Sequence, residues 1–416
     1  MGDRHSNQAA SKVPAVALAA TIALVALAAR PGDSGEFPVV VTPGPSPTRF
    51  DLPASPFNYA HPDLPAHFRT ALVRRLDNTP VGNPTTDDGA TLGRVLFHDR
   101  RFSADGTLNC ASCHAQSNAF ADPNRVSKGV GGLLGDRNAM GLVNARFHAR
   151  GRFFWDERAR SLEAQVLKPI EDPREMAHDL DAALGAIRLD PAYPPLFRKA
   201  FGDEAIDRDR VAKALAQFVR SIVSYRSKFD DGLASAGSIA ADFANFTPAE
   251  NRGKSIFLGD HDRASRGNCA TCHLRNYAFN RPDDRAGQEA VFVPDRLMNN
   301  GLDAEFATLD NGVGDLTLNP ADYGRFKVPD LRNIELTAPY MHDGRFGNLE
   351  QVVEHYNTGV KPHPNLDPHL RIGRGRPGPR LMHLDDDGKA ALVAFLKTLT
   401  DRPLVADPKF SDPFRR

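Results

Sequence analysis

The chain has 416 residues, of which 41% are hydrophobic and 25% are charged. This length is too great for one ordinary core and suits two domains, and the composition is that of a folded protein rather than a disordered or fibrous one. The 52 basic residues balance 52 acidic ones, which argues against a nucleic-acid partner, because such proteins need a basic excess. Four cysteines are too few for a disulfide-stapled scaffold.

The first thirty residues have the pattern of an export signal. Arg4 and Lys12 precede an uncharged apolar run at 13–29, whose Ala-Leu-Ala end resembles the small residues before a signal-peptidase cut. We therefore expect 1–30 to be a cleaved signal peptide. An uncleaved N-terminal anchor is the alternative, because the run is at the short edge of what spans a bilayer. Either way the rest of the chain is exported to the periplasm, with membrane contact only if this segment is kept.

All four cysteines fall into two identical patterns, Cys110-Ala-Ser-Cys113-His114 and Cys269-Ala-Thr-Cys272-His273. Cys-x-x-Cys-His is the attachment pattern of a c-type haem, in which two thiols one helical turn apart bond the porphyrin and the imidazole binds iron. A zinc site needs no His after each pair, a dithiol redox centre explains only one pair, and a disulfide within Cys-x-x-Cys is strained. The sequence therefore predicts two covalently bound haems, with His114 and His273 as iron ligands.

The surroundings of the two motifs repeat. A Gly-basic-x-aliphatic-Phe segment precedes each motif, at 93–97 and 253–257, and Ala-Phe follows each, at 119–120 and 278–279. Such a repeat at a fixed spacing indicates two duplicated haem-binding units.

Helix signals dominate the chain and strand signals are scarce. Thr247-Pro248-Ala-Glu250 is a capping box with Pro at the first helical position, and 85–97 is predicted to begin a helix in a similar way. Between the units, apolar residues recur every three or four positions, as on one face of a helix: Val211, Leu215, Phe218, Ile222 and Tyr225. We predict an all-α chain with two cytochrome c-like domains, each enclosing one haem.

The expected domain order follows from the positions of the motifs. After the signal, the Pro-rich stretch 31–65 is predicted to be a linker, because it cannot form a regular helix. A first haem domain is then expected at 66–235, a second at 236–405, and a C-terminal tail at 406–416.

Several ordered motifs resemble those of the bacterial di-haem cytochrome c peroxidase family. Besides the two Cys-x-x-Cys-His patterns they are FFWDERA at 153–159, KVPDLRN at 327–333 and LTAPYMHDG at 336–344. The likeness runs from about Asn78 to about Arg402. It implies a peroxide-reacting haem in the first domain and an electron-transfer haem in the second.

The resemblance also bears on the second iron ligand of the second haem. In the ordinary peroxidases a Met lies fourteen residues after the His of the Pro-Tyr-x-His-Asp-Gly motif, and in the MauG branch a Tyr takes that place. Here the residue fourteen positions after His342 is Tyr356. The chain therefore resembles the MauG branch, which implies Tyr356 as a ligand of the second haem. His355 and Met341 are the rival ligands. The alternative is that Tyr356 is an ordinary core tyrosine with no role at iron. A tyrosinate would favour the higher oxidation states of iron.

The first haem is expected to be open on its distal side. Ordinary family members carry a distal His in the loop after the first motif, and this His must leave on activation. The corresponding loop here, 128–138, contains no His, and the nearest is His148, which we expect to pack in the next helix. This departure also resembles the MauG branch.

Further roles come only from the family positions. The resemblance implies Glu175 as the acid/base that moves protons of peroxide, Gln165 as a hydrogen-bonding group in the same pocket, and Trp155 as an electron relay between the haems. From composition alone, Glu175 would be part of a solvated helix start and Trp155 a large core aromatic.

One calcium ion is also implied, bound between the domains by one side-chain amide and two backbone carbonyls. The matching residues are Asn138, Thr337 and Pro339, with Asn144 as the alternative amide. Oxygen ligands completed by water suit this hard cation.

Three functions remain in competition. The first is a cytochrome c peroxidase, an oxidoreductase that reduces hydrogen peroxide to water with electrons from a small periplasmic cytochrome c or cupredoxin. The second is a MauG-type enzyme that stores oxidising equivalents and oxidises residues of a partner protein. The third is a non-catalytic di-haem electron carrier, against which the His-free loop counts.

Overall fold

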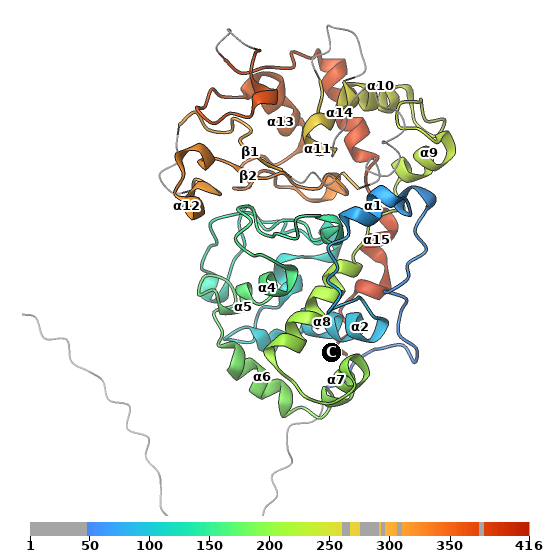
Figure 1. Ribbon diagram of the computed structural model, residues 1–416, viewed down its shortest axis with the longest axis vertical. Coiled ribbons are helices and arrows are strands. Elements are labelled where there is room, and N and C mark those ends of the chain that lie inside the picture. Colours follow the sequence, from blue (N-terminus) through green and yellow to red (C-terminus); the bar gives the residue numbers. More distant parts are fainter. Residues whose placement is uncertain are drawn as a thin grey trace, which may run out of the picture. The chain divides into compact units, whose positions relative to one another are not determined.

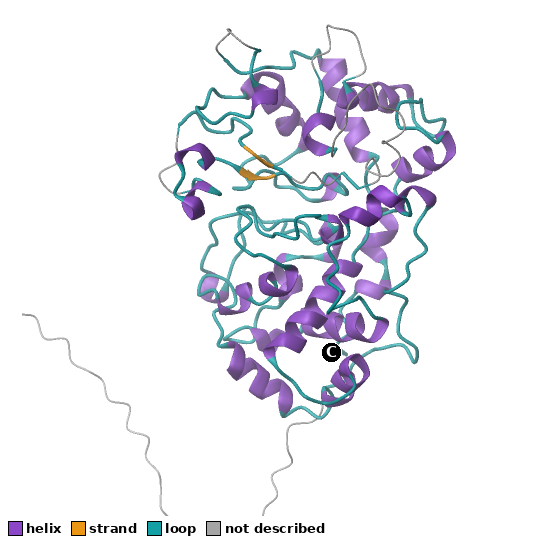
Figure 2. Cartoon of the chain, viewed as in Figure 1, coloured by secondary structure: helices purple, strands orange, loops and turns teal. Residues whose placement is uncertain are grey.

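The computed structural model describes residues 48–259, 267–274, 291–292, 296–305, 310–373 and 378–415. The predicted signal segment, residues 31–47 of the linker and the second Ala-Phe repeat lie outside these residues. Within them, regular structure is almost entirely helical, as Figure 2 shows, and the all-α prediction is confirmed. None of the described helices combines the length and apolar character needed to cross a membrane.

The helices are short and are joined by long irregular segments. In chain order they are α1 (Ala71–Leu76), α2 (Asp87–His98), α3 (Cys110–Cys113), α4 (Leu162–Gln165), α5 (Lys168–Glu171), α6 (Leu180–Arg188), α7 (Pro194–Phe201), α8 (Arg208–Ser221), α9 (Lys228–Ala236), α10 (Pro248–Leu258), α11 (Ala270–His273), α12 (Gly314–Thr317), α13 (Leu349–Glu354), α14 (Asp386–Lys397) and α15 (Arg402–Ala406). Two short strands, β1 (Leu297–Met298) and β2 (Phe326–Lys327), pair antiparallel.

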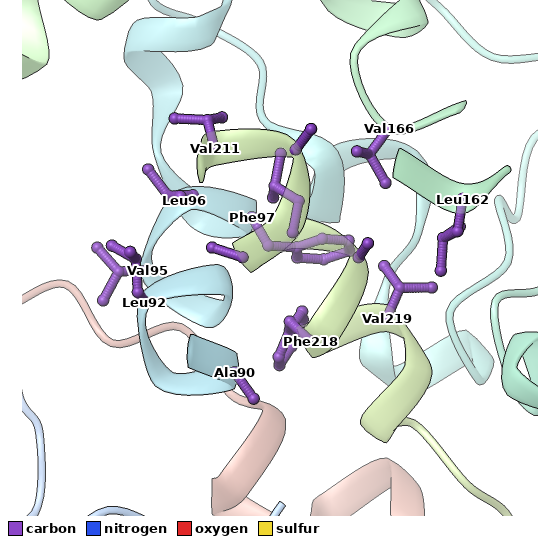
Figure 3. Packing of buried hydrophobic residues seen from close by; sticks show 14 of the residues in the cluster. Ala90, Leu92, Val95, Leu96, Phe97, Leu162, Val166, Val211, Phe218 and Val219 are labelled. Carbon is purple, nitrogen blue, oxygen red and sulfur yellow. The ribbon is translucent and has the colours of Figure 1, made fainter. Parts of the chain in front are cut away.

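The first hydrophobic core forms where α2 crosses α8. Figure 3 shows Phe97 of α2 beside Phe218 and Val219 of α8, and the rings of Phe97 and Phe218 lie 5.2 Å apart between centroids. Leu162 of α4 packs into the same cluster. This core collects buried residues from the stretch 59–222 and two from the chain's end.

A second core forms in the same way where α10 crosses α14, and it takes its buried residues from 229–399. In Figure 1, α10, α11, α13 and α14 lie together, as α2, α7 and α8 do.

Equivalent glycines allow both crossings. A Cβ at Gly93 of α2 would lie 2.0 Å from the carbonyl oxygen of Ala214, and one at Gly253 of α10 would lie 1.9 Å from that of Ala391. Only glycine permits so close a backbone approach. These glycines begin the repeated segments of the sequence, so the duplication extends to the packing of the cores.

Helix starts follow the predicted capping chemistry, with one shift. The capping box at Thr247 is present, and Pro248 is the first residue of α10. In α2 the capping residue is Thr86 rather than Thr85, because the Thr86 hydroxyl accepts a hydrogen bond from the Gly89 amide. Gln217 of α8 accepts from the Thr86 backbone amide and so anchors this start to the facing helix.

The predicted helical face from Val211 to Tyr225 is wrong at its C-terminal end. The helix stops at Ser221, and Ile222 begins an irregular segment. The Ser224 amide then donates to Asn144 and the Tyr225 amide to Asp401, 3.0 and 2.9 Å away. These side chains, far away in the sequence, satisfy the backbone in place of another helical turn.

The C-terminal residues return to the first core. Leu404 and Phe410 are buried in it, and Phe414 pairs with Phe50 through an isolated β-bridge. Although the sequence sets 406–416 apart as a tail, this segment is therefore packed against the first core.

Candidate haem sites

The first Cys-x-x-Cys-His motif forms a single helical turn after α2. Asn109 and Ser112 cap α3 reciprocally, which fixes the turn that carries Cys110 and Cys113. His114 Nδ1 lies 2.9 Å from the carbonyl oxygen of Phe120 and donates to it. That hydrogen bond leaves Nε2 as the free nitrogen, and burial lowers the pKa of His114, which favours the neutral imidazole that a metal needs.

The charge of Glu175 acts on both thiols of this motif. Burial raises the pKa of Glu175, helped by the charge of Asp172 and opposed by Arg158 and Arg174. Burial also raises the pKa of the Cys110 thiol, to which the charge of Glu175 contributes. The structure therefore brings this carboxyl close enough to the first motif for its charge to act there.

The loop after the first motif closes over the backbone of Glu175. The Val130 amide donates to the Glu175 carbonyl over 2.8 Å, and a Cβ at Gly129 would lie 2.1 Å from the carbonyl oxygen of Arg174. His148 is not part of this arrangement. It follows a 3₁₀ turn instead of packing in a helix as expected, and its ring contacts Phe153 edge-on.

Gln165 is placed less clearly. It ends α4, where its backbone amide donates to Ser161, and its side chain is half-buried. Within the described residues no hydrogen bond joins the Gln165 side chain to Glu175.

The second motif opens onto a cavity of about 260 Å³. Its walls include Cys269, Cys272, His273, Tyr356 and Met341. Burial lowers the pKa of His273 to about 4, with the Pro329 carbonyl acting in the opposite direction. Neutral imidazole is again the favoured form.

Tyr356 reaches this cavity from a π-helical turn, His355–Gly359, that follows α13. Single π-helical turns are frequent at functional sites. Burial raises the pKa of Tyr356 to about 12, and the two thiols of the motif contribute to the rise. The phenol is thus in the same space as the thiols and His273.

The three candidate ligands of the second haem are not equivalent. Met341 and Tyr356 both line the cavity. His355 is buried, and its Nε2 lies 3.1 Å from the backbone carbonyl of Asn300. That ring nitrogen is therefore already hydrogen-bonded inside the protein.

Trp155 lines the cavity of the second motif and hydrogen-bonds the loop that follows the first. Its Nε1 donates to the carbonyl of Asn138 over 2.8 Å, and its ring meets that of His342 edge-on at 6.5 Å. Ala119 and Ala121 line the same cavity as Trp155. They flank Phe120, whose backbone carbonyl accepts the hydrogen bond from His114 of the first motif. The indole is therefore close to both units.

Asn138, Thr337 and Pro339 all line this cavity. Asn138 Nδ2 donates to the Asn124 carbonyl over 3.0 Å, which turns the amide oxygen the other way. Both polar atoms of Asn144, the alternative, have partners: Oδ1 accepts from Ser224, and Nδ2 donates to Asp330.

Two polar residues of the cavity had no role in the sequence analysis. Asp330 lines the cavity, and burial raises its pKa to about 7. Asn300 also lines it and contacts the candidate ligands. Asp330 is part of the KVPDLRN motif, whereas nothing in the sequence around Asn300 marks it.

The residues present fit covalently attached haems. All four thiols are unpaired and half-buried, each pair sits on one helical turn, and a neutral imidazole follows each pair. The second pair opens onto a cavity whose walls are mostly apolar side chains.

Known proteins share these features. The family model of the di-haem cytochrome c peroxidases matches residues 87–237. The methylamine utilization protein MauG of Methylorubrum extorquens is 32% identical over 78% of this chain and 81% of its own length. The cytochrome c551 peroxidase of Nitrosomonas europaea is 34% identical over 77% and 82%.

Solved structures agree with the fold. The crystal structure of a MauG-like protein associated with microbial copper homeostasis has a TM-score of 0.68 and 33% identity, over 85% of this chain and 99% of that one. The di-haem peroxidase BthA of Burkholderia thailandensis has a TM-score of 0.60 at 23% identity, over 80% and 92%.

Proposed function

Because the chain belongs to the di-haem cytochrome c peroxidase family, we propose that it reduces hydrogen peroxide to water with electrons from a small periplasmic cytochrome c or cupredoxin. Two c-type haems and action on peroxide come with the family. One peroxide takes up two electrons and two protons and yields two waters. The protein must therefore deliver both electrons and protons to the peroxide-binding site.

The haems would be held by the two motifs. Cys110 and Cys113 would bond one and Cys269 and Cys272 the other, with the imidazoles of His114 and His273 on the irons. When bound, the haems supply the redox chemistry by which the oxygen–oxygen bond is broken. In this proposal, residues 66–235 form the domain that reacts with peroxide, and residues 236–405 form the domain that transfers electrons to it.

Glu175 is the group that we assign to the protons. A base must take a proton from one peroxide oxygen and return it to the leaving oxygen. The raised pKa of Glu175 suits this exchange, because a buried carboxylate is a stronger base than an exposed one and holds the proton that it takes up until it returns it. Gln165 would orient the bound oxygen by hydrogen bonding.

The observation that carries a MauG-like arrangement is the position of Tyr356. Its phenol shares a cavity with His273 and the second pair of thiols. Tyr356 would supply an oxygen ligand to the second haem, and such a ligand favours the oxidised states of iron. Trp155, which lines this cavity and hydrogen-bonds the loop after the first motif, would carry electrons from the second haem to the first.

One calcium ion would join the two halves at Asn138, Thr337 and Pro339. Two observations support this assignment: the hydrogen bond to the Asn124 carbonyl uses Nδ2 of Asn138 and not its amide oxygen, and all three residues line the same cavity. The export pattern at 1–30 supports a periplasmic location.

The same tyrosine supports a second function. Two MauG proteins are 32% and 33% identical to this chain, and a MauG-type enzyme would oxidise residues of a partner protein in place of a small electron donor.

Steady-state turnover with peroxide and a reduced small cytochrome c distinguishes these functions. A peroxidase oxidises two cytochromes for each peroxide over many cycles. Oxidation that stops after about one equivalent for each haem would instead favour a protein substrate, and no peroxide consumption at all would contradict both.

A further inference from the structure

Asn300 contacts all three residues that compete for the second haem. It follows β1 and lines the cavity of the second motif. Its side-chain Nδ2 lies 3.4 Å from the phenol oxygen of Tyr356 and 3.4 Å from the sulfur of Met341. Its backbone carbonyl lies 3.1 Å from Nε2 of His355. One residue is thus in position to influence which side chain binds iron.

The backbone carbonyl of Asn300 occupies Nε2 of His355, a residue that is not among those lining the cavity. The carbonyl can only accept, so His355 Nε2 carries the proton of this hydrogen bond and has no free lone pair for a metal. The ring is held next to Tyr356, with centroids 4.9 Å apart and nearly perpendicular planes. Asn300 therefore also braces the π-helical turn from which Tyr356 projects.

The side chain of Asn300 treats the other two candidates unequally. An amide N–H is a donor, and a thioether sulfur is a weak acceptor, whereas a phenolate oxygen is a strong one. A hydrogen bond to an ionised acceptor is about twice as strong as one between neutral groups. An anion in a buried cavity also requires such a donor, because it has lost its water.

The segment that carries Asn300 is well fixed. The neighbouring side chain Asn299 is buried, hydrogen-bonds His363 over 3.1 Å and accepts from the Gly301 amide. Gly301 has a positive φ of 69° and receives the Lys361 amide on its carbonyl. The backbone on both sides of Asn300 is thus fixed, and its side chain projects from a well-anchored segment.

We propose that Asn300 is a positioning residue that selects Tyr356 over Met341 as the distal ligand of the second haem. This inference rests on the proposed function, in which the second haem has a ligand opposite His273. One N–H of Asn300 forms a strong hydrogen bond with the ionised phenol oxygen of Tyr356. The same N–H would form only a weak hydrogen bond with the thioether sulfur of Met341. Removing the donor moves the balance toward the thioether.

The test compares holoprotein variants by absorption and electron paramagnetic resonance spectra of the ferric second haem and by its midpoint potential. Asn300→Leu removes the donor, and Asn300→Asp keeps the size but replaces the donor with an acceptor. Both keep the backbone bond to His355, so Asn300→Asp provides the answer if Asn300→Leu fails to take up haem.

We expect the Tyr-to-Met ligation ratio to fall about 10- to 100-fold in either variant, the range that loss of one charge-assisted hydrogen bond gives. The charge-transfer band of thioether-ligated ferric haem appears and the midpoint potential rises. Adding Met341→Leu to either variant abolishes that band. Asn365→Leu is the control, because Asn365 makes the same kind of hydrogen bonds, to the Pro320 and Tyr323 carbonyls, outside the cavity lining.

Two outcomes distinguish a failure of the proposed Tyr356 ligand from a failure of the proposed role of Asn300. If Tyr356→Phe leaves the spectrum of the second haem unchanged, the tyrosine ligand of the proposed function is wrong. If Tyr356→Phe changes the spectrum while both Asn300 variants keep that of the parent protein, the ligand stands and the role of Asn300 is wrong.

Discussion

Replacing Glu175 with Gln removes the titrating group from the first site with little structural change. The two backbone hydrogen bonds of Glu175, to Asp172 and from Val130, do not involve its side chain and are retained. The variant then loses only the proton transfer by this side chain, which contributes about 10²- to 10⁴-fold to the rate of the reaction with peroxide. This corresponds to about 2.7 to 5.4 kcal/mol of activation free energy.

The pH dependence has a definite sign. Taking a proton from peroxide requires the ionised carboxylate, so the rate of the parent protein rises as pH increases through the raised pKa of Glu175. Glu175→Gln is expected to react slowly at all pH values, without this rise. Stopped-flow absorption with peroxide between pH 4 and 9 measures both effects.

Glu171→Gln is the matched control for this experiment. Glu171 ends α5, is exposed, and forms a surface ion pair with Arg208 at 2.6 Å. Such pairs are worth at most about 1 kcal/mol, so we expect an unchanged rate with peroxide. A Glu175→Gln protein that reacts within about threefold of the parent rate would refute the role of this carboxyl as the base.

Three further changes have separate readouts. Trp155→Phe is expected to slow electron transfer between the haems while peroxide binding stays unchanged; in rapid mixing with a reduced donor, equal transfer rates would exclude the relay role. Asp230→Asn removes the carboxylate charge that lies 2.6 Å from the buried Arg332 guanidinium and should lower the free energy of unfolding by about 3 to 5 kcal/mol in urea; a loss below about 1 kcal/mol would contradict this. Burial acts to raise the pKa of Asp230, but Arg332 and other partners hold it well below its ordinary value, so this stabilisation is present above about pH 4 and disappears as pH falls further. Chelation of calcium should lower the melting temperature of the parent protein but not that of Asn138→Ala, and an equal shift in both would exclude Asn138 as a ligand.

Local chemistry explains what the sequence predicted well. The helical turns of the two Cys-x-x-Cys segments, the repeated segments at 93–97 and 253–257 and the capping box at Thr247 depend on residues next to one another in the chain, and the structure forms each of them. Ranking the candidate ligands at Tyr356 needed the family resemblance, because a tyrosine on an amphipathic helix is ordinary core material. Its π-helical turn becomes visible only in the structure.

Long-range contacts explain what was missed. The helix predicted through Tyr225 ends at Ser221 because Asn144 and Asp401 bind the backbone that follows. Asn300 is 56 residues from Tyr356 in the chain, and no periodicity or motif links the two. Such pairings arise from tertiary packing, which overrides local preference.

The most direct test of the MauG-like arrangement is to mix the fully ferric protein with hydrogen peroxide and follow its absorption spectrum in the stopped flow. With a first haem free of a distal His and Tyr356 on the second, we predict a rapid spectral change without any prior reduction. A protein that is inert to peroxide until one haem has been reduced would contradict this account and place the chain with the ordinary peroxidases.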